Sequence, residues 1–317
     1  MDSTASPPSP PPLAAFALVT DVQYADVDDG WDFHRVSQRY YRGALRQLEA
    51  CAAEWLRVHR DEQRLSFAVD LGDALDGKNR AAGTTRAALA QVQRAWVPVS
   101  AALGGAVHHL VGNHELYNLS RAEFHRELLW PPARKLADGD DLRCYYDFVV
   151  PEAPRYRFVV LDSYGLALLG RDKGDATRQA ALDLLRRANP NEVLNSPDGL
   201  QGVARRFVAF NGAHVLLFSH IPLHPATAPP SCLLWNFPQV LEAIAQVRCV
   251  RAVFSGHSHN DGYVEDRGTH FVSSDAILEC APHETAHAVV ELHADRVRVR
   301  GYGKIPTREL RFPAEGD

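Results

Sequence analysis

Apolar residues along this chain alternate between short continuous runs and longer stretches with helical spacing. The runs at Leu13–Val19, Leu65–Leu71 and Val107–Val111 are typical of strands that are buried on both faces. Between them, apolar residues three or four positions apart predict helices over about Val36–Val58 and about Thr84–Trp96. Strand and helix therefore alternate, which predicts an α/β fold with a parallel sheet.

The second half of the chain continues this alternation and then changes its period. We expect strands at Tyr156–Leu161, Val215–Phe218 and Val250–Phe254, with a helix over about Pro238–Gln246. From about residue 262 to 300 apolar and polar residues alternate one by one, most clearly in Arg296–Arg300. Antiparallel strands should therefore complete the sheet system.

Two further segments have local signals. Ser120-Arg-Ala-Glu123 is a capping box, so a helix should begin at Ser120. Residues 189–202 are dense in turn formers, and we interpret them as an ordered active-site loop.

Composition limits the class of protein. The chain has 317 residues, 46% hydrophobic and 23% charged, which suits one domain over 13–317 behind a proline-rich disordered tail at 1–12. A net charge of -5 without a basic cluster argues against nucleic acid or a membrane surface as partner. Five cysteines without a Cys-x-x-Cys pair indicate a reducing, cytoplasmic environment. We expect a monomer that acts on a small anionic molecule.

Polar residues follow five of the apolar runs. These segments are Asp21-Val-Gln23, Gly72-Asp73, Gly112-Asn-His114, Ser219-His220 and Gly256-His-Ser-His259. Because parallel strands all end at one edge of a sheet, these side chains should converge although they are distant in sequence. Carboxylate, amide and imidazole groups that meet in this way predict the two-metal site of a phosphoesterase.

Each segment also has a simpler interpretation when it is taken alone. Asp73 is compatible with a helix or turn cap, and Asn113-His114 with a plain turn. His220 could be a hydrogen-bonded core histidine. Only the five segments together, in this order, favour the metal site.

The same segments resemble those of the calcineurin-type metallophosphoesterases: Asp-x-Gln, Gly-Asp-x-x-Asp-Gly (72–77), Gly-Asn-His-Glu, Ser-His and Gly-His-x-His. Further stretches make the chain similar to the manganese-dependent ADP-ribose/CDP-alcohol diphosphatases from Phe16 to about Pro306. These stretches are Asp21–Asp26, Arg39–Arg42, Asn113–Asn118, Asn189–Asn191, Leu194–Pro197 and Gly256–His259.

The resemblance implies a four-layer αββα sandwich and two divalent cations, Mn²⁺ or alternatively Mg²⁺. It implies that one cation is held by Asp21, Gln23, Asp73 and His259, and the other by Asp73, Asn113, His220 and His257. The catalytic residues would be the bridging carboxylate of Asp73 and His114, which would stabilise or protonate the leaving oxygen. The substrates would be ADP-ribose, cleaved to AMP and ribose 5-phosphate, and CDP-alcohols such as CDP-choline, cleaved to CMP and phosphocholine.

The chain departs from the calcineurin-type pattern at two places. Gln23 stands where most such enzymes have His, and an amide oxygen shifts the preference toward Mn²⁺ or Mg²⁺. Relatives also have an amphipathic helix before the strand that ends at His220, whereas Phe207–Gly212 leads almost directly to Val215. We therefore expect no crossover helix there, and Asn211-Gly212 could turn a hairpin.

The substrate pocket has weaker signals. Candidates for a wall around the nucleoside are Trp31, Phe33, Leu194, Asn195, Ser196, Cys232 and Trp235, although aromatic residues more often belong to the core. Two alternatives stay open: another phosphomonoesterase or phosphodiesterase on the same site, and a binding protein that keeps the fold without turnover.

Overall fold

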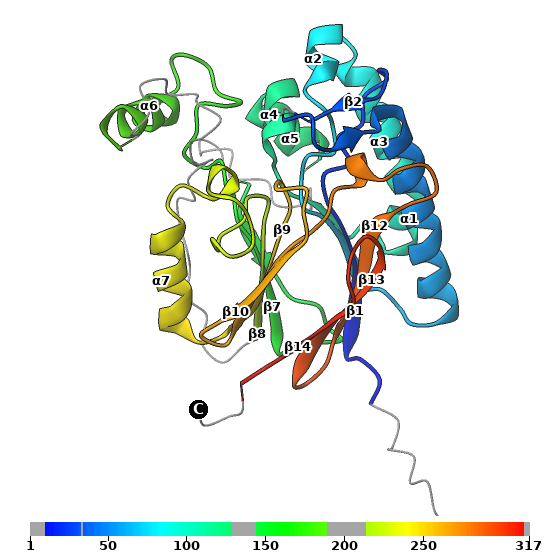
Figure 1. Ribbon diagram of the computed structural model, residues 1–317. Coiled ribbons are helices and arrows are strands. Elements are labelled where there is room, and N and C mark those ends of the chain that lie inside the picture. The colour runs from blue at the N-terminus through cyan, green and yellow to red at the C-terminus, as the bar shows by residue number, and fades with distance from the viewer. Residues whose placement is uncertain (1–9, 33, 129–143, 189–213, 314–317) are drawn as a thin grey trace, which may run out of the picture.

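Two six-stranded sheets lie face to face at the centre of the molecule, with helices on both outer sides (Figure 1). The structure is a computed structural model and describes residues 10–32, 34–128, 144–188 and 214–313. The strand order in the first sheet is β14 (Arg308–Arg311), β13 (Arg296–Gly303), β12 (Ala286–Leu292), β1 (Ala14–Val19), β4 (Phe67–Asp70) and β5 (Val107–His109). The order in the second sheet is β10 (Gly262–Asp266), β11 (Thr269–Ser273), β9 (Val250–Ser255), β8 (His214–Ser219), β7 (Tyr156–Val160) and β6 (Tyr146–Phe148).

Parallel pairing is confined to the middle of this arrangement. Strands β1, β4 and β5 run parallel in the first sheet, and β7, β8, β9 and β11 run parallel in the second. Strands β12, β13 and β14 add to β1 in antiparallel register, as the alternating pattern near the end of the chain predicted. The carboxyl ends of the parallel strands are therefore available to build one site.

The helices form the outer layers and the rim of that site. Helices α1 (Tyr41–Asp61) and α3 (Thr85–Ala102) lie on the outer side of the first sheet, and α7 (Phe237–Val247) lies on the outer side of the second (Figure 1). The remaining α-helices are α2 (Lys78–Ala82), α4 (Asn113–Asn118), α5 (Arg121–Glu127) and α6 (Ala176–Ala188), and the short 3-10 helices are η1 (Pro230–Cys232) and η2 (Ile277–Glu279). Strands β2 (Gly30–Trp31) and β3 (Gln38–Arg39) pair in a separate two-stranded ribbon. The four-layer αββα arrangement expected from the sequence is confirmed.

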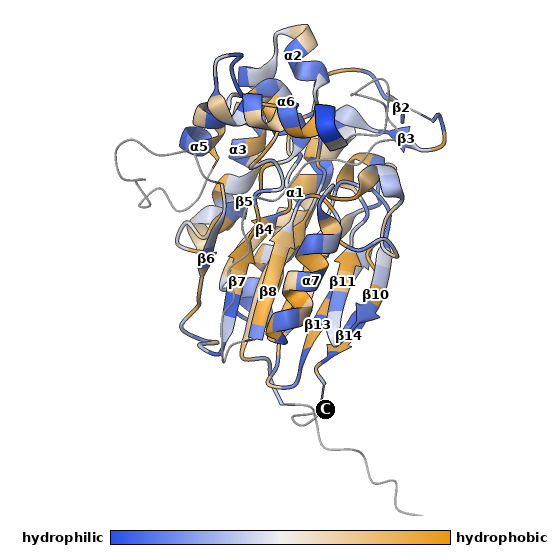
Figure 2. Cartoon of the chain, turned by 90° about the vertical axis from the view of Figure 1, so that its left-hand side faces the viewer, coloured by the Kyte–Doolittle hydropathy of each residue, from blue (hydrophilic) through white to orange (hydrophobic). Residues whose placement is uncertain are grey.

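Aromatic side chains fill the space between the two sheets. Phe16 on β1 is fully buried and stacks on Phe67 of β4 with ring centroids 4.6 Å apart. The rings of Phe158, Phe218 and Phe254, from three strands of the second sheet, meet Phe16 edge-on at 5.6–6.3 Å. Figure 2 shows apolar residues concentrated on these strands. Edge-to-face packing of this kind joins the sheets and makes their relative position rigid.

Most predicted elements are present, with shifted ends. Helix α1 begins at Tyr41 and not near Val36, because Gln38 and Arg39 pair with Trp31 and Gly30 in the ribbon. Helix α3 continues to Ala102 although it contains a proline. The capping box at Ser120 is confirmed: its hydroxyl accepts from the Glu123 amide, and the Glu123 carboxylate accepts from the Ser120 amide.

The connection between β7 and β8 contains a helix that the sequence analysis did not predict, while the segment directly before β8, where no helix is expected, lies outside the described residues. Strands β7 and β8 pair in parallel, and helix α6 lies between them in the chain. Strand β8 also pairs in parallel with β9 on its other edge, so it has no free edge for an antiparallel hairpin partner. The turn proposed at Asn211-Gly212 and the loop 189–202 lie outside the described residues, as does most of the proline-rich tail.

Among the described residues, no helix combines the length and the apolar character needed to cross a membrane.

Candidate metal centre

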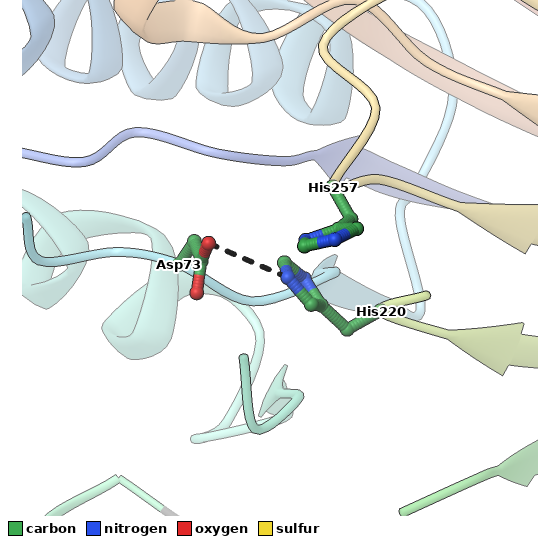
Figure 3. A group of neighbouring side chains, drawn as sticks. All are labelled: Asp73, His220 and His257. Atoms are coloured by element: carbon green, nitrogen blue, oxygen red, sulfur yellow. Dashed lines mark ion pairs between the residues drawn. The ribbon is translucent and has the colours of Figure 1, made fainter. Parts of the chain in front are cut away.

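The five polar segments do converge at one edge of the two sheets. Asp73, which follows β4 of the first sheet, lies beside His220 after β8 and His257 after β9 of the second. A ligand atom of each residue lies within 4.8 Å of the others (Figure 3). The convergence expected from the sheet topology is therefore present, while the assignment of these groups as metal ligands stays a prediction.

The backbone is held in an unusual conformation at these residues. Nine described residues other than glycine have positive φ, and five of them are predicted ligands: Asp21, Gln23, Asp73, His257 and His259. Left-handed backbone is unfavourable for residues with a Cβ and is retained mainly at functional sites. The fold thus strains the chain to direct these side chains inward.

Two glycines permit the close packing around them. Gly72 has φ +107°, and a Cβ there would lie 2.8 Å from Nδ1 of His220. A Cβ at Gly256 would lie 2.5 Å from Oδ2 of Asp21 and would also collide with Oγ1 of Thr20. A side chain at either position would displace a residue of the centre.

The first predicted ligand group contains Asp21, Gln23, Asp73 and His259. Nε2 of Gln23 lies 3.3 Å from Oδ2 of Asp73 and 2.9 Å from Nε2 of His259. Nε2 of His259 is 3.3 Å from Oδ1 of Asp21. Oε1 of Gln23 is buried without a hydrogen-bond partner. The amide nitrogen faces the other ligand atoms, and because the oxygen and nitrogen of an amide have nearly the same shape, a half-turn of the amide would place Oε1 among them, where a cation would satisfy it.

The second predicted group contains Asp73, Asn113, His220 and His257. Nε2 of His220 lies 3.4 Å from Oδ2 of Asp73 and 3.3 Å from Oδ1 of Asn113. The rings of His220 and His257 meet edge-on with centroids 5.0 Å apart. Asp73 is shared by both groups, which is the arrangement that a bridging carboxylate requires.

Outer partners orient two of the histidines. Nδ1 of His220 donates to the Leu71 carbonyl at 2.9 Å, and Nδ1 of His259 donates to the Glu279 carboxylate at 2.9 Å. In both rings Nε2 is left facing the centre, as metal-binding histidines require. Sequence reasoning missed Glu279, because it lies 20 residues after His259 and no motif connects the two.

A second missed residue, Glu115, shapes the turns that carry Asp73 and Asn113. Its carboxylate accepts from the backbone amides of Gly112 and Asp73 at 2.9 and 2.8 Å, and from Ala74 at 2.6 Å. The sequence showed Glu115 only as the last residue of Gly-Asn-His-Glu. Glu115 therefore joins the turn that carries Asp73 to the turn that carries Asn113.

The centre has an excess of negative charge. Burial alone would lower the pKa of His259, but Asp21 and Glu279 raise it to about 9. Burial would also lower the pKa of His220, which Asp73 raises to about 10. By contrast, burial and the neighbouring His220 lower the pKa of His257 to about 3. Carboxylates that draw protons onto two imidazoles offer the same attraction to divalent cations.

His114 lies at the rim of this centre. Nδ1 accepts a hydrogen bond from the Gly77 amide at 2.8 Å and lies 3.3 Å from Oδ2 of Asp76. The ring of Tyr117 packs edge-on against it at 5.1 Å. With Nδ1 accepting, the neutral ring carries its proton on Nε2.

The candidates for the substrate pocket are only partly described. Phe33, Leu194 and Asn195 lie outside the described residues, as does Ser196. Cys232 lies half-buried in η1, where burial raises the pKa of its thiol. Trp235 lies half-buried in the turn before α7, and Trp31 on β2 is 56% exposed.

Carboxylate, amide and imidazole donors around one shared aspartate fit two divalent cations of the Mn²⁺ type. The chain matches the calcineurin-like phosphoesterase family over residues 15–261, a range that contains all seven predicted ligands. The fold and this match place the chain among the calcineurin-like phosphoesterases.

Individual relatives narrow the class. The chain is 34% identical to the manganese-dependent ADP-ribose/CDP-alcohol diphosphatase of Oryza sativa subsp. japonica, with 95% of each chain covered. It is 30% identical to the protein of that name from Homo sapiens, over 96% of this chain and 94% of the relative. The crystal structure of a dimetal phosphatase from Danio rerio superposes with a TM-score of 0.80 at 33% identity, over 95% of this chain and 100% of that one. The chain therefore belongs to the family of manganese-dependent ADP-ribose/CDP-alcohol diphosphatases.

Proposed function

We propose that this chain is a manganese-dependent hydrolase that cleaves the diphosphate bond of ADP-ribose and of CDP-alcohols such as CDP-choline. The products would be AMP with ribose 5-phosphate, and CMP with phosphocholine. The observation that carries the proposal is the pair of ligand groups that share Asp73, in a chain similar over almost its whole length to enzymes named for this activity.

Seven side chains would hold the metals. Asp21, Gln23 and His259 would bind one cation together with Asp73, and Asn113, His220 and His257 would bind the other with Asp73. When bound, two such cations supply Lewis acidity at a phosphoryl group and lower the pKa of water. Mn²⁺ is the metal we propose, with Mg²⁺ as the alternative.

His114 would serve the leaving group. Because the Gly77 amide donates to Nδ1, the proton of the neutral ring is on Nε2, which can donate a hydrogen bond to the leaving phosphate oxygen. Transfer of a proton to that oxygen requires the positively charged ring, which Asp76, 3.3 Å from Nδ1, would stabilise, and the transfer leaves the ring neutral. The Asp73 carboxylate accepts a hydrogen bond from the backbone amide of His114 at 2.8 Å, and this bond fixes the position of His114 relative to the predicted metal ligands.

Substrate assays with product identification test this function. Purified protein with Mn²⁺ should hydrolyse ADP-ribose to AMP and CDP-choline to CMP, with little release of phosphate from AMP itself. Preferred cleavage of phosphomonoesters or cyclic nucleotides would contradict the substrate assignment while keeping the metal centre. Tight binding of Mn²⁺ without turnover of any nucleotide would instead support a binding protein.

His114→Ala separates the acid role from a binding role. It should lower kcat for ADP-ribose far more than for an activated nitrophenyl nucleotide ester, because help from an acid matters most for a basic leaving group. Equal losses on both substrates would mean that His114 positions the phosphate and donates no proton.

A further inference from the structure

Tyr164 is a buried tyrosine whose hydroxyl reaches the metal centre from the second sheet. It lies just after β7 and is 2% exposed. Its hydroxyl donates to Oδ1 of Asn113 at 3.1 Å. That oxygen is the atom that also lies 3.3 Å from Nε2 of His220, so Tyr164 contacts the donor atom that the second cation would use.

The backbone of Tyr164 is anchored by a buried ion pair. Asp162 accepts from the Tyr164 amide at 3.1 Å, and the Tyr164 carbonyl accepts from Nη1 of Arg121 at 3.3 Å. Arg121 and Asp162 form an ion pair in which each side chain is 3% exposed. Since Arg121 begins α5, this pair joins the end of β7 to the helices that follow Asn113. The backbone of Tyr164, which determines where its hydroxyl lies, is therefore fixed by Asp162 after β7 and by Arg121 of α5.

An asparagine amide needs such a partner to act as a ligand. Its oxygen and nitrogen have nearly the same shape, and only the oxygen can bind a cation. The hydroxyl of Tyr164 donates to the oxygen of the Asn113 amide. Because a carbonyl oxygen has two lone pairs, it can accept from Tyr164 and still bind a metal.

We propose that Tyr164 is a positioning residue, which fixes the Asn113 amide with Oδ1 toward His220 and so sets the Mn²⁺ affinity of the second ligand group. The proposal rests on the proposed function, because it needs a metal at that group. Because Asn113 belongs only to the second ligand group, Tyr164 should affect the binding of one of the two cations and not the other.

Removal of the single hydroxyl in Tyr164→Phe tests this role. We would titrate the chelator-treated full chain with Mn²⁺ by calorimetry and follow the dinuclear centre by electron paramagnetic resonance. The parent should bind two Mn²⁺. The variant should keep one affinity and weaken the other about 10- to 100-fold, as is usual for an outer partner of a ligand.

Tyr156→Phe is the matched control. The Tyr156 hydroxyl is also buried, but it donates to the His293 carbonyl at 2.6 Å, away from the predicted ligands. This variant should unfold at a lower temperature and bind both Mn²⁺ ions as the parent does.

The outcomes separate this proposal from the proposed function. If Tyr164→Phe binds both ions with parental affinity, or loses affinity for both equally, the positioning role is wrong and the function stands. A parent that takes up no Mn²⁺ and hydrolyses neither substrate would refute the proposed function, and this role with it.

Discussion

Loss of the negative charge on Glu279 should weaken the first cation site without disturbing the fold. Its carboxylate accepts from Nδ1 of His259 at 2.9 Å, and its side chain is only 10% exposed. A hydrogen bond to a charged group contributes about 1.5–3 kcal/mol. Glu279→Gln keeps an acceptor in the same place and removes the charge, so we expect the smaller part of this effect. Glu279→Ala removes both.

These energies convert into dissociation constants. A loss of about 1.4 kcal/mol raises Kd tenfold, so Glu279→Gln should bind Mn²⁺ at the first site about tenfold more weakly. Glu279→Ala should approach the roughly 100-fold loss seen when outer ligand partners are deleted. The second site should be unchanged in both variants, which is the opposite of the result expected for Tyr164→Phe.

Calorimetric titration with Mn²⁺ measures both sites, and the unfolding temperature without metal reports on the fold. Glu284→Gln provides the control, because Glu284 lies five residues after Glu279 and accepts from the Ala281 amide at 2.9 Å. Mn²⁺ affinities of Glu279→Gln within twofold of the parent would refute the reasoning. A larger loss for the Gln variant than for the Ala variant would also do so.

Asp73→Asn should abolish nearly all turnover and preserve folding, because an amide cannot carry charge to two cations; near-parental kcat with two bound metals would show that Asp73 does not bridge. Gln23→His should shift the preference from Mn²⁺ toward Zn²⁺, since imidazole binds zinc better than an amide oxygen does, and identical activity profiles across Mn²⁺, Mg²⁺, Zn²⁺ and Co²⁺ would count against this. Burial lowers the pKa of His108 from 6.5 to about 3, so the histidine stays neutral when folded, and the stability present above pH 6.5 is lost as the pH falls toward 3. Between about pH 8 and pH 5, protonation of His108 should lower the free energy of unfolding by about 2 kcal/mol. His108→Phe keeps a ring that can stack on Phe148, so its free energy of unfolding, measured with urea, should fall by about 2 kcal/mol less than that of the parent over the same pH range. An equal loss in parent and variant would place the acid sensitivity elsewhere.

The parts of the fold that follow from local pattern were predictable. Buried strands appear in the sequence as short apolar runs, and a parallel sheet then requires the residues after them to meet. Asp73, His220 and His257 are 147 and 37 positions apart along the chain, yet this argument alone brings them to one edge. The capping box at Ser120 was equally local, because both of its hydrogen bonds are made within four residues.

The missed features depend on contacts that no short pattern shows. Tyr164 is 51 residues from Asn113, and its neighbours in sequence do not distinguish it from a core aromatic residue. Glu279 lies in a 3-10 helix whose position is determined by backbone bonds from Ile277 and Leu278 to Thr20 and Asp21. Helix α6 is a different case. The apolar residues of Ala176–Ala188 have the spacing of an amphipathic helix, so this helix was predictable from the sequence although it was not predicted.

Each predicted cation would be bound by side chains from both sheets. Asp21, Gln23, Asp73 and Asn113 follow strands of the first sheet, while His220, His257 and His259 follow strands of the second. Each bound metal would therefore act as a cross-link between the two sheets at one end of the sandwich. A ligand present at about 100 times its Kd stabilises the folded state by about 2.7 kcal/mol. Chelation should consequently loosen the sheets first at the end that holds the centre, while the aromatic packing around Phe16 still joins them along their length.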